Sequence, residues 1–142
     1  MKVVLDSNIL FSALISGKES YIDILKVLDV YVPDFIFQEL SKYNERILKK
    51  TKLKTEISSF VRQLFSEITV IPKFAISKEN YRKAENLCQD IDPKDTVYLA
   101  LSLELDIPLW SNDKELLNGL SQKGYANIIT TKEIFNQVLG KS

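Results

Sequence analysis

The sequence has no histidine, and it contains one cysteine among 142 residues. Without histidine, neither a Ser-His-Asp nor a Cys-His nucleophile can form, and no imidazole can bind a metal ion. The single cysteine, Cys88, excludes disulfides within the chain and thiolate zinc clusters. Because Cys88 lies in a segment with helical apolar spacing, we expect a small buried side chain rather than a reactive thiol.

Glycine is also scarce, with four residues, and neither G-x-G-x-x-G nor the complete P-loop motif occurs. A Rossmann or P-loop nucleotide site therefore has no support from the sequence. The sequence has 19 lysine and arginine residues and 19 aspartate and glutamate residues, so its formal net charge is zero. The net charge therefore does not indicate binding to nucleic acid. Any such binding would need a local excess of positive charge.

Length and hydropathy indicate one folded domain over residues 1–142, since 45% of residues are hydrophobic and 27% are charged. The chain enters a strand at once, without the features of a signal peptide, and has no apolar run of membrane-spanning length. We therefore expect a soluble cytoplasmic protein.

Short apolar runs alternate with helical patterns along the chain. The predicted strands are Lys2–Leu5, Val30–Val32, Ile68–Ile71, Pro108–Trp110 and Asn127–Thr130. The predicted helices are Asn8–Ile15, Tyr21–Leu28, Phe35–Lys49, Lys54–Glu67, Ser77–Gln89, a segment from Asp92 to Leu105, one from Lys114 to near Gly124, and Lys132–Leu139. This alternation predicts an α/β fold of three layers, α/β/α, with a central parallel sheet of about five short strands.

The stretch from Ile91 to Leu116 places two carboxylates at helix starts around a buried strand. Asp92 is a predicted N-cap, Pro93 suits the first helical position, and Asp95 follows in the first turn. After the strand, Asp113 begins the next helix. Ligands of open α/β sheets bind at this edge.

Two further acids are expected near the same edge. Asp6 directly follows the first strand and shares the edge with Asp113 if the first and fourth strands are neighbours. Glu39 lies one helical turn from Ile36 and from Tyr43, so it borders the inward stripe of its helix. Taken singly, each acid could be a local cap, a turn ligand or a surface charge. Independent caps, however, have no reason to gather on one edge.

Several carboxylates brought together need a counter-charge, because like charges raise one another's pKa values. Oxygen ligands without histidine or cysteine favour Mg²⁺ or Mn²⁺. A metal-bound water is a nucleophile, and the metal offsets charge on the leaving oxygen. The chemistry that suits such a site is phosphodiester hydrolysis.

Four motifs, VVLDSN, FQEL, DPKDTVYLAL and LWSND, occur in an order and spacing that resemble the PIN domain family. This family comprises metal-dependent ribonucleases and includes the toxins of VapBC toxin–antitoxin pairs. The resemblance implies an endoribonuclease with Asp6, Glu39, Asp95 and Asp113 as catalytic and metal-binding acids. It also implies Asn8 and Ser111 as supporting residues, Mg²⁺ or Mn²⁺ as cofactor, RNA as substrate, a small antitoxin as partner and a homodimer.

The sequence departs from the family pattern at two places. Many toxin members have small residues after the third acid, where this chain has Tyr98-Leu99-Ala100. The family often has threonine where Ser111 stands, a change that keeps the hydroxyl group. These departures leave the nuclease fold better supported than the toxin role.

Positive charge is concentrated after Glu39, at Lys42, Arg46, Lys49, Lys50, Lys52 and Lys54. The segment could border an RNA backbone, or it could be a solvated helix end, where lysine is common. The aromatic residues Tyr21, Phe35, Phe37, Phe60 and Phe65 have core-like spacing. They are more consistent with packing or a dimer face than with base stacking.

Two other classes of function stay open from the sequence. A phospho-acceptor or aspartyl-phosphatase site also begins with an acid after the first strand, but Asn8 replaces the second aspartate that such a phosphatase needs. The other class is a non-catalytic RNA-binding or scaffold module that keeps the fold with a weak site.

Overall fold

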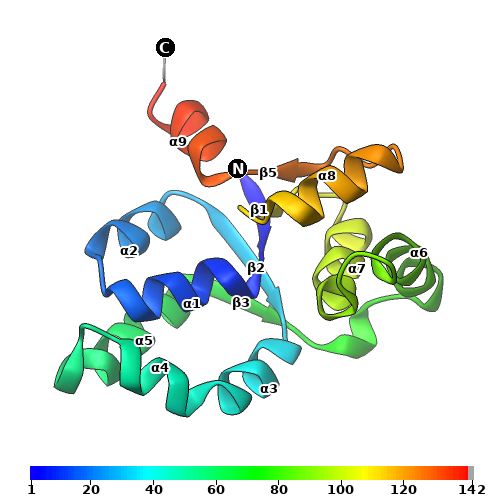
Figure 1. The fold of residues 1–142 in the computed structure, drawn as a ribbon. Coiled ribbons are helices and arrows are strands. Elements are labelled where there is room, and N and C mark those ends of the chain that lie inside the picture. Colours follow the sequence, from blue (N-terminus) through cyan, green and yellow to red (C-terminus); the bar gives the residue numbers. More distant parts are fainter. Residues whose placement is uncertain (141–142) are drawn as a thin grey trace.

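The computed structural model describes residues 1–140 and has a five-stranded sheet between two helical layers (Figure 1). The strands are β1 (Lys2–Leu5), β2 (Asp29–Pro33), β3 (Ile68–Ile71), β4 (Leu109–Trp110) and β5 (Ile128–Ile129). Their order is β3-β2-β1-β4-β5, and every neighbouring pair is parallel. The predicted α/β/α fold with a central parallel sheet is therefore confirmed.

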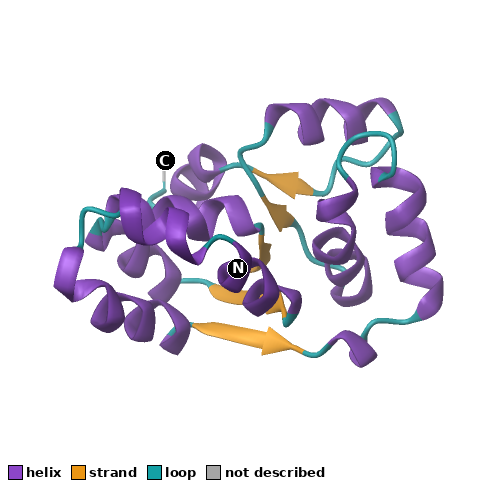
Figure 2. Ribbon diagram, turned by 60° about the horizontal axis from the view of Figure 1, so that its bottom comes forward, coloured by secondary structure: helices purple, strands orange, loops and turns teal. Residues whose placement is uncertain are grey.

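The helices form layers on both faces of this sheet (Figures 1 and 2). They are α1 (Ser7–Ser16), α2 (Glu19–Lys26), α3 (Phe35–Lys42), α4 (Asn44–Lys50), α5 (Ile57–Ser66), α6 (Lys78–Cys88), α7 (Thr96–Leu105), α8 (Lys114–Gln122) and α9 (Thr131–Val138). Short 3₁₀ turns are η1 (Lys54–Glu56), η2 (Lys73–Ala75) and η3 (Pro93–Asp95). Helices α1, α2, α4 and α5 lie on one side of the strands, and α7, backed by α6, lies on the other.

The predicted single helix Phe35–Lys49 is wrong, because the chain breaks between α3 and α4 at Tyr43. Tyr43 has φ −102° and ψ 12°, and no glycine or proline marks the position. Its ring packs edge-on against Phe11 of α1, with 5.6 Å between centroids. This tertiary contact accompanies the break and turns α4 back toward α1, so local sequence signals could not predict it.

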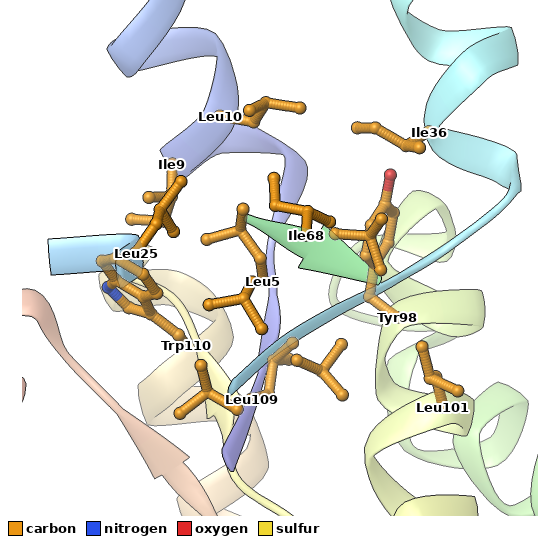
Figure 3. Packing of buried hydrophobic residues seen from close by; sticks show 14 of the residues in the cluster. Leu5, Ile9, Leu10, Leu25, Ile36, Ile68, Tyr98, Leu101, Leu109 and Trp110 are labelled. Carbon is orange, nitrogen blue, oxygen red and sulfur yellow. The ribbon is translucent and has the colours of Figure 1, made fainter. Parts of the chain in front are cut away.

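The core extends continuously from the sheet into both helical layers (Figure 3). Its largest fully buried side chains include Trp110 and Leu109 of β4, Leu5 of β1, Leu10 of α1, Ile36 of α3, and Tyr98 and Leu101 of α7. Cys88 is fully buried, and burial raises the pKa of its thiol to about 12, which confirms the predicted buried role. No helix in residues 1–140 is both long and apolar enough to cross a bilayer.

The pairing of β1 with β4 brings together the ends of two strands that are distant in sequence. Val4 pairs with Leu109 and Leu5 with Trp110, so both strands end at the same height. The backbone N–H of Asp6 donates to the Trp110 carbonyl over 3.0 Å. Strands β1 and β4 are therefore neighbours, which is the arrangement that brings Asp6 and the residues after β4 to one edge of the sheet.

Candidate active site

Asp6 lies at the junction of β1 and α1, with 1% of its surface exposed. Its Oδ2 accepts a 2.6 Å hydrogen bond from the Ser111 hydroxyl, and its Oδ1 accepts the backbone N–H of Asn8 over 3.4 Å. Burial raises the pKa of Asp6, these two bonds oppose the rise, and the charge of Asp113 adds to it. Ser111 therefore supports Asp6 directly, whereas Asn8 does so through its backbone N–H.

Glu39 is buried on α3, and both of its carboxylate oxygens have partners. The Tyr98 hydroxyl of α7 donates to Oε1, and the Ser7 hydroxyl of α1 donates to Oε2 over 3.5 Å. Burial raises the pKa of Glu39, and the nearby positive charge of Lys94 opposes this. The sequence did not predict roles for Ser7 and Tyr98, although both lie inside the quoted motifs.

Asp95 is buried at the start of α7, and its Oδ2 has no hydrogen-bond partner among residues 1–140. Its side chain makes no capping bond, so stabilisation of the helix start does not explain its position. Burial, and then the negative charges of Asp6, Asp92, Asp113 and Glu39, raise its pKa to about 8. An unpartnered buried carboxylate among other carboxylates is costly unless a cation or a proton compensates it.

Asp113 is the N-cap of α8, as one of the local readings of the sequence predicts. Its Oδ1 accepts the backbone N–H groups of Glu115 at 3.0 Å and Leu116 at 3.2 Å. The N–H of Asp113 donates over 3.1 Å to the same Ser111 hydroxyl that binds Asp6. Ser111 thus links Asp113 to Asp6. The negative charge of Asp113 raises the pKa values of both Asp6 and Asp95.

The site opens into a groove of about 380 Å³. Its polar lining includes the side chains of Ser7, Asn8, Glu39, Asp92 and Asp95. Asp92 accepts the backbone N–H of Lys94 over 3.1 Å, so its predicted role as an N-cap is confirmed.

The lining of the groove also includes basic and aromatic side chains, namely Arg46 and Lys50 of α4, Phe11 and Tyr43. Part of the basic segment predicted from the sequence therefore reaches the acids. Lys42 is not part of this lining, and its ammonium group lies 5.3 Å from the centroid of the Tyr43 ring.

A model of the PIN domain family matches residues 4–136. The chain belongs to the PIN domain family. No curated protein matches the sequence. This membership gives the chain a nuclease-type fold, and the match spans all four acids together with Ser111.

The donor groups of this PIN domain fit a hard divalent cation in their chemistry. All candidate ligands are carboxylate or hydroxyl oxygens, and the unpartnered Oδ2 of Asp95 is available to a cation. The acids are not pre-arranged, however, because no group of three acidic or cysteine side chains within residues 1–140 is placed to hold a metal ion. Asp6 and Glu39 are instead bonded to hydroxyl groups, so the carboxylates lie close enough to repel one another without converging.

Proposed function

We propose that the protein is a Mg²⁺- or Mn²⁺-dependent endoribonuclease that hydrolyses RNA phosphodiester bonds at Asp6, Glu39, Asp95 and Asp113. The observation that carries the proposal is Asp95, whose buried carboxylate has an oxygen without a partner and four acids nearby. A fold that keeps such a group at the carboxyl ends of its strands needs a ligand to compensate it. A divalent cation is the ligand that suits an all-oxygen set.

The four acids divide into three kinds by their surroundings. Asp95 is the principal candidate ligand, and Asp6 and Glu39 can join it through the oxygen lone pairs that remain while Ser111 and Tyr98 keep donating to them. Asp113 uses Oδ1 to cap α8 and contributes negative charge to the site. A bound divalent cation supplies Lewis acidity toward the phosphoryl group and lowers the pKa of water.

Hydroxyl groups of neighbouring side chains hold Asp6 and Glu39 in place before a cation binds. Ser111 bridges Asp6 and the backbone of Asp113, while Tyr98 holds Glu39 from the opposite side. These contacts set the orientation of the Asp6 and Glu39 carboxylates before substrate arrives, as outer partners of metal ligands do.

The groove gives the RNA backbone a path across the acids. Arg46, Lys50 and Lys94 line the groove and can neutralise phosphates near the scissile bond. Glu39 and Asp95 line this groove together with these cations, whereas Asp6 and Asp113 are not part of its lining. A site that binds a polyanion beside carboxylates needs such cations. This arrangement supports RNA as the substrate.

The proposed biological role is that of the toxin in a toxin–antitoxin pair. It rests on the resemblance of the sequence motifs to VapBC toxins, and a small antitoxin would block the groove. A homodimer remains a prediction. Phe37, whose ring stacks on Phe65 within the chain with centroids 5.8 Å apart, is half exposed and is an apolar side chain that a dimer interface would cover. Light scattering of the purified protein measures the oligomeric state directly.

One observation favours a second candidate, a non-catalytic RNA-binding or scaffold module. The acids in residues 1–140 do not form a ready-made metal site. A module of this kind would bind RNA in the groove without cutting it.

Cleavage of a panel of structured RNAs in Mg²⁺, Mn²⁺ or EDTA separates the two candidates. The control is an Asp6→Asn, Asp95→Asn double variant purified identically. We expect metal-dependent cleavage by the wild type and none by the double variant. RNA binding without cleavage under every condition would favour the scaffold module, and equal cleavage by both proteins would indicate contamination.

A further inference from the structure

Two smaller hollows continue the active groove across the surface. The first, of about 200 Å³, shares Lys94 with the active groove and also contains Lys73 and Tyr81. The second, of about 270 Å³, shares Lys73 and Tyr81 with the first and adds Lys78 and Arg82. The shared side chains make the three depressions consecutive, from the acids to the N-terminal turns of α6.

The walls of these hollows carry an excess of positive charge. Lys73, Lys78, Arg82 and Lys94 are all exposed, and none of them forms an ion pair within residues 1–140. The one carboxylate in the lining, Asp34, accepts the backbone N–H of Lys73 over 3.3 Å. Unpaired cations along a continuous depression attract a polyanion.

An exposed aromatic residue, Phe74, directly follows Lys73 in the chain, although it is not part of the lining of either hollow. Phe74 is 91% exposed, although a phenylalanine normally contributes to the core. It lies on η2, the short turn that Figure 1 shows between β3 and α6. The ammonium group of its neighbour, Lys73, lies 5.2 Å from the centroid of the Tyr81 ring.

The turn that carries Phe74 is fixed on both sides. The N–H of Ala75 donates to the Pro72 carbonyl, and that of Ile76 donates to the Lys73 carbonyl, each over 3.0 Å. The Ile76 side chain is buried in the core. The exposed ring is therefore presented by an anchored turn, which lowers the entropic cost of binding a partner.

We propose that Lys73, Phe74, Tyr81, Arg82 and Lys94, here named the flank site, bind the single-stranded part of the RNA that extends from the active groove. The identity of the ligand rests on the proposed function. Alternating phosphates and bases match the cations and the open ring, since bases stack on aromatic faces and phosphates pair with Lys and Arg. The base on Phe74 must be unstacked, so this part of the RNA is single-stranded.

RNA affinity without cleavage tests this assignment independently of nuclease activity. We would measure fluorescence anisotropy of a labelled oligouridine of about 12 nucleotides, a length within the range of single-strand sites. The protein would be the full-length Asp6→Asn, Asp95→Asn double variant in EDTA, which also reduces the repulsion between acids and RNA. Circular dichroism would confirm that each further variant is folded.

Loss of the ring should matter more than loss of apolar area. We expect Phe74→Ala to weaken binding by about tenfold. Phe74→Tyr should retain the affinity, whereas Phe74→Leu should lose it. Changing Lys73 and Arg82 together to alanine should reduce the slope of log affinity against log salt by about 1.4, because each lost phosphate contact lowers this slope by about 0.7.

Matched controls lie far along the chain on α9 and after it. Lys132→Ala removes an exposed cation, and Leu139→Ala removes an apolar side chain that is 74% exposed. Both should bind RNA as the parent does. The Phe74 variants and the Lys73, Arg82 double variant should also have no effect on an RNA of about 4 nucleotides, near the lower limit of single-strand sites and too short to reach beyond the groove.

Two results would overturn the flank site. One is equal affinity of the flank-site variants and the controls for the longer RNA. The other is unchanged RNA affinity together with loss of self-association in Phe74→Ala, which would identify a protein interface. Parallel cleavage assays with Mn²⁺ in the wild-type background separate the two proposals. If the wild type cleaves RNA but the flank-site variants bind RNA normally, only the flank site is disproved. If the variants bind RNA more weakly but the wild type does not cleave it, only the proposed nuclease activity is disproved.

Discussion

Replacing Asp95 with asparagine should stabilise the metal-free protein at neutral pH. The carboxylate is 6% exposed, has an unpartnered oxygen and lies among four other acids. Its pKa is raised from 3.8 to about 8, so the folded state binds this proton more tightly than the unfolded state does. Asparagine keeps the shape of the side chain and removes the charge.

The sign and size of the pH effect follow from this pKa. Below pH 3.8 the group is protonated in both states and contributes no electrostatic penalty. Between pH 3.8 and about 8 the folded state loses about 1.4 kcal/mol per pH unit relative to the unfolded state. From pH 5 to pH 8, the difference in unfolding free energy between variant and wild type should therefore widen by about 4 kcal/mol. Asp6 and Glu39, whose pKa values are also raised, add to the loss in both proteins.

Urea unfolding in EDTA at several pH values measures this difference. Asp23→Asn, a change at an exposed position of α2, is the matched control and should show no such widening. Mn²⁺ at about a hundred times its dissociation constant should stabilise the wild type by about 2.7 kcal/mol and the Asp95→Asn variant much less. A difference that does not change with pH would show that Asp95 is not a buried acid of raised pKa, and equal stabilisation of both proteins by Mn²⁺ would show that Asp95 is not a metal ligand.

Three further substitutions test the supporting contacts. Tyr98→Phe removes the hydroxyl donor to Glu39 and should weaken Mn²⁺ binding by roughly tenfold in calorimetry, whereas unchanged affinity would leave Tyr98 a packing residue only. Ser111→Ala removes the 2.6 Å bond to Asp6 and should lower the unfolding free energy by about 1–2 kcal/mol in denaturant titrations, which a neutral result would contradict. Thr130→Ala breaks the capping box of α9 and should cost about 1 kcal/mol in the same assay with Mn²⁺ affinity unchanged, so a loss of affinity would contradict its purely structural role.

Much of the fold follows from local sequence patterns. Apolar runs that alternate with helical spacing predict the strands, and KVVL and ITVI form β1 and β3 with the predicted bounds. The strand order did not follow from these patterns. The break at Tyr43 did not follow, because it accompanies packing against Phe11, 32 positions earlier in the chain. Contacts of this kind depend on the assembled layers and leave no local signal.

The site shows the same division between local and long-range information. The positions of Asp6, Asp95 and Asp113 at strand and helix ends could be predicted, because end positions follow from apolar runs and capping residues. The partners of Glu39 could not, since the contact with Tyr98 spans 59 positions and joins α3 to α7. The exposure of Phe74 could not be predicted either, because phenylalanine is usually a core residue and its spacing in the sequence resembles that of core residues.

The most direct test of the account is to locate Mn²⁺ in a crystal of the wild-type protein by its anomalous scattering. We expect a peak within coordination distance of Asp95 and of at least one oxygen of Asp6 or Glu39. The Asp95→Asn crystal should lack this peak under the same conditions. A peak elsewhere on the surface, or a wild-type site without Mn²⁺ at concentrations that saturate other sites, would contradict a metal-dependent nuclease at these acids.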